Sequence, residues 1–205
     1  SLDLVDVTVK APNDAYFDET IFTEINADGN VASNADGMAP AIVAMASIED
    51  VQSGQSEASI SVVGFDPVFD GGFGAFELAD GTATQGSDLL PDEVFINGNA
   101  AQKLDAQAGD SVILRYLPVG ESYGHVSTFT VKQVVIDSGK GNYQASANVF
   151  MNLGEMQSLY NVSGKINLVK ISGTGGMRAG VHETDSIMAA VNGTLASSTN
   201  PDALR

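Results

Sequence analysis

Short strand-like segments fill the middle of this chain, and segments that mix strands with helices flank them on both sides. Alternating apolar residues between turn signals predict the strands, which are residues 4–9, 41–51, 58–64, 93–96, 111–116, 129–136, 148–151 and 165–172. Apolar stripes at helical spacing predict helices over residues 14–25 and 184–195, and short helices are expected over residues 97–104 and 154–160. Because helices and strands are grouped rather than strictly alternating, this order predicts an α+β fold. We expect residues 1–85 and 160–205 to form one mixed subdomain, which a β-rich subdomain over residues 86–159 interrupts.

A long hairpin is the clearest local prediction. The apolar segments 41–51 and 58–64 are joined by the turn-forming residues 52–55, which favours antiparallel pairing. The following stretch, residues 69–76, combines glycines with three phenylalanines but has neither the GxGxxG nor the GxxxxGK[ST] pattern of a phosphate-binding loop. We therefore expect it to hold aromatic side chains against the core.

Three of the expected helices are indicated by particular residues. Phe17, Ile21 and Ile25 lie four residues apart and predict a buried stripe on the first helix. Asn97 is of the type that caps a helix, so the second helix is expected to start there. The last helix is expected to carry Ile187, Met188, Val191 and Leu195 on one face.

Charge excludes two broad functions. The chain has 205 residues, of which 26 are acidic and 9 are basic, so its formal net charge is −17. No cluster of Lys or Arg interrupts this excess, which argues against binding nucleic acid or an anionic membrane surface. There is no cysteine, so disulfides, thiol nucleophiles and cysteine-held metals are excluded as well.

No recognisable catalytic constellation accompanies these elements. His125 and His182 lie in polar, turn-like contexts without HExxH or HxH spacing, which favours surface histidines over metal ligands. A GxSxG nucleophile elbow is absent, and Thr174 on a glycine-rich turn is the nearest substitute. The many carboxylates are expected to form a solvated surface. We therefore expect a protein that is not an enzyme, with no catalytic, cofactor-binding or metal-binding residues and no cofactor.

The tetrapeptide NADG occurs twice, at residues 26–29 and 34–37, and its oxygen-bearing side chains suggest a calcium loop. A frame that opens at Glu24 places Ala35 where a bidentate Glu is needed, so the spacing is wrong for an EF-hand. Two turns built on residues that tolerate positive φ explain the same residues better.

Two further patterns have simple explanations. The methionines are scattered, which favours core filling over copper binding; they are Met38, Met45, Met151, Met156, Met177 and Met188. Asn161 and Asn192 each begin an N-glycosylation triplet, which matters only if the chain is displayed outside a cell; the sequence leaves their modification open.

Three runs of residues, in their order and spacing, resemble the extracytoplasmic (periplasmic core) domain of MacB/FtsX-like ABC transporter permeases, especially archaeal members. The runs are EVFINGNAAQKLDAQAGDSVILRY (93–116), FTVKQVVID (129–137) and NVFMNLGEMQSLYNVSGKINLVKIS (148–172). The earlier GFDP at residues 64–67, before the glycine- and phenylalanine-rich stretch, resembles the family's passage into its inserted lobe. The helix within the first run is less apolar than the family pattern leads one to expect.

The resemblance implies a porter-like α/β-sandwich subdomain (1–85 and 160–205) interrupted by a β-rich Sabre-like subdomain (86–159). It also implies a place between membrane-spanning helices, on the extracytoplasmic side of the cell membrane, so that the chain is a soluble fragment of a membrane-anchored protein. The implied partners are cytoplasmic ABC ATPase subunits, a second permease copy, and an unknown substrate or extracytoplasmic partner protein. The family offers no catalytic residues in this domain to transfer.

Two other functions are left open by the residues themselves. One is a secreted or cell-surface adhesion module that binds calcium through its acidic loops. The other is a hydrolase with an unrecognised site. Neither requires the chain to continue into membrane-spanning helices, whereas the permease domain does.

Overall fold

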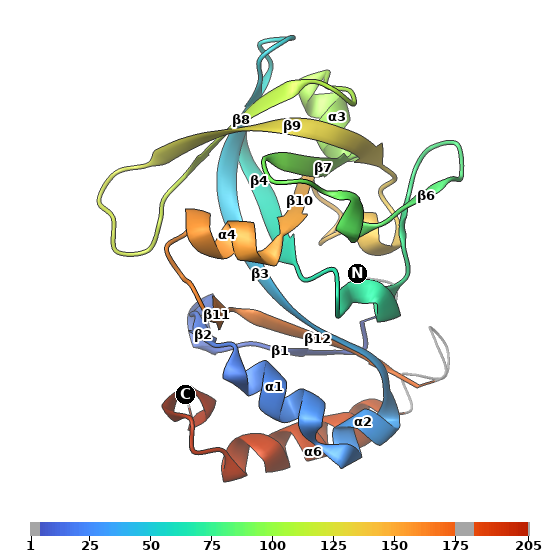
Figure 1. The fold of residues 1–205 in the computed structure, drawn as a ribbon, viewed down its shortest axis with the longest axis vertical. Helices are drawn as coiled ribbons and strands as arrows, with labels where there is room; N and C mark the ends of the chain where they lie inside the picture. The colour runs from blue at the N-terminus through green and yellow to red at the C-terminus, as the bar shows by residue number, and fades with distance from the viewer. Residues whose placement is uncertain (1–4, 175–182, 205) are drawn as a thin grey trace.

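A closed six-stranded β-barrel forms one end of the molecule in a computed structural model that describes residues 5–174 and 183–204 (Figure 1). Each strand is hydrogen-bonded to the next, and the last pairs back with the first. The β10–β4 and β7–β9 pairs are parallel, and the other pairs are antiparallel. In barrel order the strands are β3 (Ala35–Asp50), β4 (Ser56–Phe65), β10 (Asn148–Asn152), β7 (Glu93–Asn97), β9 (His125–Val135) and β8 (Ser111–Tyr116).

The long strand β3 leaves the barrel and continues into a second part of the molecule, which we call the α/β layer. Here the first residues of β3 pair with β12 (Leu168–Gly173), and β12 pairs with β1 (Val7–Val9). Three helices, α1 (Thr20–Ala27), α2 (Gly29–Asn34) and α6 (Thr184–Ser197), lie beneath this sheet in Figure 1. The α/β layer thus consists of β1, β12, the first residues of β3, and these three helices.

Short elements complete the chain. The remaining α-helices are α3 (Gly98–Leu104) and α4 (Leu153–Leu159), and two small ribbons pair β2 (Phe17–Asp18) with β11 (Lys165–Ile166) and β5 (Phe76–Glu77) with β6 (Ala83–Thr84). The 3₁₀ helices include η1 (Pro12–Asp14), η2 (Asp70–Phe73), η3 (Gly86–Asp88), η4 (Gly139–Gly141) and η6 (Pro201–Leu204).

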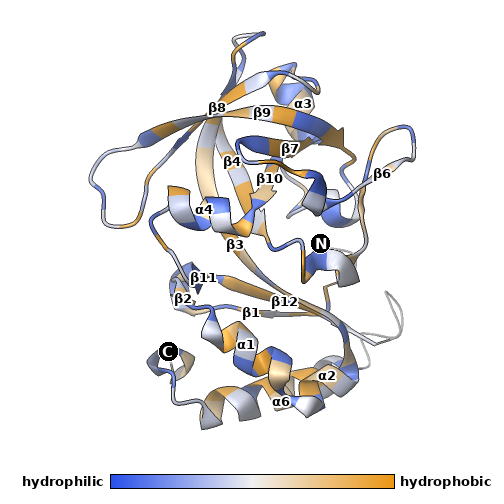
Figure 2. Cartoon of the chain, in the orientation of Figure 1, coloured by the Kyte–Doolittle hydropathy of each residue, from blue (hydrophilic) through white to orange (hydrophobic). Residues whose placement is uncertain are grey.

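Alternate residues of the barrel strands enter two different cores. The larger core takes residues from all six strands, such as Ile48, Val62 and Val131, which fill the barrel interior, and it continues between the sheet and the helices of the α/β layer. On β4 the next residue, Val63, instead joins a second core on the outer face, together with Phe65, Phe76, Phe95, Phe150 and others. Apolar residues accordingly run along most barrel strands in Figure 2.

Several local predictions are confirmed. The hairpin expected over residues 41–51 and 58–64 is formed by β3 and β4. The strand 111–116 is β8, and it pairs with β9 as expected for residues 129–136. Asn97 caps α3, because its side-chain oxygen accepts a hydrogen bond from the Ala100 N–H at 3.1 Å.

The helix predicted over residues 14–25 is wrong in its first half. Phe17 lies in β2, where it pairs with Ile166, and α1 begins only at Thr20. The carboxylate of Asp18 accepts hydrogen bonds from the Thr20 N–H at 2.9 Å and the Thr20 hydroxyl at 2.7 Å, which supports the helix start. Phe17 is buried nevertheless, because its side chain on β2 packs in the same core as the buried residues of α1.

The two NADG turns are also wrong. Asp28 caps a second helix, α2, by accepting from the N–H groups of Asn30 and Val31 at 2.8 and 3.3 Å. The second tetrapeptide runs from the end of α2 straight into β3, and neither it nor the first contains a residue with positive φ. Turns do not form here, because Asp28 starts the helix α2 and β3 begins directly after that helix ends.

One hydrogen-bonded sheet passes through all three expected segments of the chain. It contains β1, β3 and β4 from residues 1–85, four strands from residues 86–159, and β12 from residues 160–205. The hairpin β3–β4 therefore supplies barrel strands, and the passage from the barrel to the α/β layer lies within β3.

Candidate partner-contact surface

Exposed apolar side chains gather on the connection between β8 and β9 and at the start of β9. Leu117, Val119, Tyr123 and Val126 are 56%, 47%, 73% and 62% exposed. Between Leu117 and Val126 the sequence contains one carboxylate, Glu121, and no Lys or Arg, in a chain whose net charge is −17. Large exposed side chains with little charge around them are typical of contact surfaces for other molecules.

The base of this connection is held firmly. The Val119 N–H donates to the Tyr160 carbonyl at 2.9 Å, and the rings of Tyr116 and Tyr160 lie 5.2 Å apart. The Tyr116 hydroxyl and the Ser127 hydroxyl are 2.9 Å apart and share a hydrogen bond. Burial raises the pKa of Tyr160, which stays neutral beneath the loop. In Figure 1 the connection projects sideways from the barrel, so an anchored base presents an exposed tip.

This surface was not predicted from the sequence. Its signal is four large apolar residues within a ten-residue stretch that also carries Pro118, Gly120 and Gly124. Turn residues predict a loop, and apolar residues in a loop are expected to be buried unless they contact something else. That combination is what sequence analysis could have used.

The chemistry-bearing residues considered from the sequence lie apart. His125 is exposed at the start of β9, and Thr174 is exposed on the turn after β12. His182 and Met177 lie outside the described residues. Met151 and Met156 fill the core, whereas Met45 and Met188 are about half exposed. Asn161 and Asn192 are both exposed.

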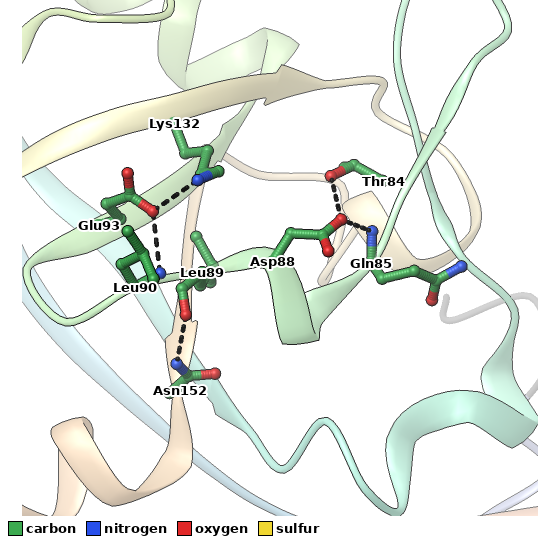
Figure 3. A network of polar contacts seen from close by, with 8 residues as sticks. All are labelled: Thr84, Gln85, Asp88, Leu89, Leu90, Glu93, Lys132 and Asn152. Atoms are coloured by element: carbon green, nitrogen blue, oxygen red, sulfur yellow. Dashed lines mark hydrogen bonds and ion pairs between the residues drawn. The ribbon is translucent and has the colours of Figure 1, made fainter.

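Acidic side chains near the barrel rim are used for structure. In Figure 3 the Glu93 carboxylate accepts hydrogen bonds from the Leu90 N–H and the Lys132 ammonium, each at 2.9 Å, and in that order they lower its pKa. Asp88 accepts from the Gln85 N–H at 2.9 Å. These carboxylates accept hydrogen bonds from nearby donors and so hold residues 85–93 against the barrel.

Residues 5–174 and 183–204 contain neither a candidate metal site nor a candidate membrane-spanning helix. No group of three or more His, Asp or Glu side chains there is arranged to hold a metal ion. In the same part of the chain, no helix combines the length and the hydropathy needed to cross a bilayer.

Comparison with known proteins places the fold among extracytoplasmic domains. No protein-family model and no curated protein sequence matches the chain. The structure is similar to the periplasmic region of MacB from Actinobacillus actinomycetemcomitans, with a TM-score of 0.55, 12% identity, and coverage of 91% of this chain and 76% of that one. It is also similar to the extracellular domain of the noncanonic ABC-type transporter YknZ from Gram-positive bacteria, with a TM-score of 0.58, 12% identity, and coverage of 94% and 95%. The chain thus shares a mixed α+β fold, including its six-stranded barrel, with these domains.

Proposed function

We propose that the chain is the extracytoplasmic domain of a MacB/FtsX-like ABC transporter permease. The observation that carries the proposal is a fold shared over more than nine-tenths of the chain with two such domains, together with the sequence runs that resemble the same family. The archaeal assignment rests on the sequence resemblance alone.

In this proposal the domain is not an enzyme. It couples transmembrane movement, driven by ATP hydrolysis in separate cytoplasmic subunits, to substrate export or to the handling of a partner protein outside the membrane. A second permease copy completes the complex. Coupling of this kind requires a folded unit that moves with the spanning helices and changes its contacts between nucleotide states.

The arrangement of the two parts suggests an orientation. The first and last described elements, β1 and η6, both belong to the end of the molecule that holds the α/β layer, while the barrel lies at the other end (Figure 1). We propose that the α/β layer is porter-like and faces the membrane. The barrel strands of residues 86–159 are then the Sabre-like subdomain, and β3 joins the two.

The full-length gene product tests the proposal directly. We expect the sequence on both sides of this chain to continue into membrane-spanning helices, and the purified membrane protein to bring down an ABC ATPase subunit. A product that is secreted without any spanning helix would overturn the proposal.

A photo-crosslinking residue at Tyr123 of the full-length protein tests the contact surface. We expect a discrete crosslinked product in cells, and we expect Leu117→Ser with Val126→Ser to reduce it at least fivefold, because the apolar contact area is lost. Val68, which is 81% exposed on another surface, is the matched control position and should give no such product. Equal crosslinking from both positions would contradict a specific role for this surface.

A further inference from the structure

Three charged side chains are buried together where the barrel meets the α/β layer. The side chains of Asp70, Lys140 and Lys170 are 1%, 6% and 5% exposed. Charged groups are rarely buried to this extent unless they are paired, because leaving water is costly for an ion. The cluster is therefore a specific feature of the fold, and neither the contact surface nor the transport proposal uses it.

The Asp70 carboxylate binds both lysines. Its Oδ1 lies 2.5 Å from Lys170 Nζ, and its Oδ2 lies 2.8 Å from Lys140 Nζ. Lys140 Nζ also donates to the carbonyl oxygens of Asp70 and Gly74, both at 3.0 Å. One carboxylate thus bridges two cations that are 30 positions apart in the sequence.

Aromatic rings complete the surroundings of the two ammonium groups. Lys170 Nζ lies 4.8 Å from the centre of the Phe73 ring, and Lys140 Nζ lies 5.0 Å from that of Phe76. Both distances are in the range of cation–π attraction, which is stronger away from water. The phenylalanines of residues 69–76 therefore do more than fill the core, because two of them also support the buried cations.

The three charged residues belong to different parts of the molecule. Lys170 lies on β12 of the α/β layer, in register with Ala39 of β3. Lys140 lies in η4, which follows the barrel strand β9. Asp70 is the first residue of η2, and its carboxylate lies between the two lysines. The cluster consequently ties the α/β layer to the barrel through side chains, in addition to the backbone of β3.

We propose that Asp70, Lys140 and Lys170 form an interlobe clamp that fixes the angle between the barrel and the α/β layer. The two parts share β3 and one apolar core, and a strand surrounded by non-directional apolar contacts can still bend. A bridge between η4 and β12 opposes that bending. The two parts then move as one rigid body, whatever process the domain serves.

Single lysine substitutions test the clamp without leaving a lone buried charge. Two ammonium groups and one carboxylate leave one positive charge in excess, so either Lys170→Met or Lys140→Met leaves a balanced pair. Each variant cuts one arm of the clamp. Lys132→Met is the matched control, because the Lys132–Glu93 ion pair joins two barrel strands and does not reach the α/β layer.

The measurement is the distance distribution between two spin labels, by pulsed electron paramagnetic resonance. The chain has no cysteine, so Gln102→Cys on α3 and Ala189→Cys on α6, both exposed, give one label on each part. We expect a single narrow distribution for the parent and for Lys132→Met, and a distribution at least twice as wide for Lys170→Met and Lys140→Met. Parental widths in both lysine variants would overturn the clamp.

Loss of folding in a variant would not end the test. If circular dichroism shows that a methionine variant is unfolded, the same labels are read in Lys170→Gln or Lys140→Gln, which keep a hydrogen-bond donor and lose the charge. The clamp predicts broadening in these variants too. A folded glutamine variant with the parental width would count against it as strongly.

Discussion

Gly37 and Gly72 determine how closely η2 can approach β3, and so whether Asp70 can reach Lys170. A Cβ atom built on Gly72 would lie 2.8 Å from the Gly37 Cα, closer than folded proteins allow. The neighbouring Gly71 has no atom within 4 Å of such a Cβ. Two adjacent glycines therefore have different roles, one in backbone contact and one in open space.

Alanine substitutions separate these roles. Gly72→Ala is expected to lower the free energy of unfolding by about 1–3 kcal/mol, because β3 and η2 must move apart. Gly71→Ala is expected to change it by less than about 0.5 kcal/mol. Urea unfolding of the two variants measures the difference, and equal stabilities would show that the close contact is not important.

Single residues also show the limits of sequence-based prediction. The capping role of Asn97 follows from local sequence, since the atoms it serves are three residues away. Its second role does not, because its side-chain amide donates to Asn148, 51 residues away, and its oxygen accepts the Asn148 N–H at 2.9 Å. Contacts between distant segments exist only once the fold has formed.

At the level of elements, Asn167, which comes just before the first residue of β12, extends the pairing of β12 with β3. Its side-chain oxygen accepts the Val43 N–H at 2.9 Å, and its side-chain N–H₂ donates to the Val43 carbonyl at 2.8 Å. The amide thus takes the place of a backbone rung where the chain passes from β11 to β12. A sequence pattern predicts one strand over residues 165–172, because it cannot show that a side chain replaces the backbone here.

Removing this amide tests its role in the sheet. Asn167→Ala is expected to lower the free energy of unfolding by about 1–3 kcal/mol, because two partly buried backbone groups of Val43 lose their partners. Amide hydrogen exchange at Val43 should become faster. Asn192→Ala, at an exposed position of α6, is the control and should leave that exchange unchanged. Unchanged Val43 exchange in Asn167→Ala would contradict the assignment.

Individual strands were predictable, but their closure into a barrel was not. Period-2 patterns indicate β3, β4 and β8 because each is a local signal. The barrel closes through the pairing of residues 47–50 with 112–115, and through the parallel pairing of β10 with β4. Neither pairing leaves a signature in local sequence. The exposed apolar tip between β8 and β9 was missed for the related reason that exposure depends on the whole fold.

At the level of the whole molecule, the net charge of −17 acts on every part at once. A folded chain of this length has a radius of gyration of about 17 Å. At 0.01 M salt the Debye length is about 30 Å, so carboxylates on opposite sides repel one another, whereas at 1 M it is about 3 Å. Unfolding moves these charges apart, so their repulsion at low salt favours the unfolded chain.

Raising sodium chloride from 0.01 to 0.5 M at pH 7 should therefore stabilise the domain, by about 2 kcal/mol, which corresponds to a rise in Tm of about 4–8 °C at this chain length. Calorimetric scans over the salt range measure the rise. The same scans near pH 4.1, the isoelectric point, are the control. There the protonated carboxylates leave little net charge, and the Tm should change little with salt. A rise of equal size at both pH values would mean that salt acts on apolar burial rather than on charge repulsion, and would contradict the prediction.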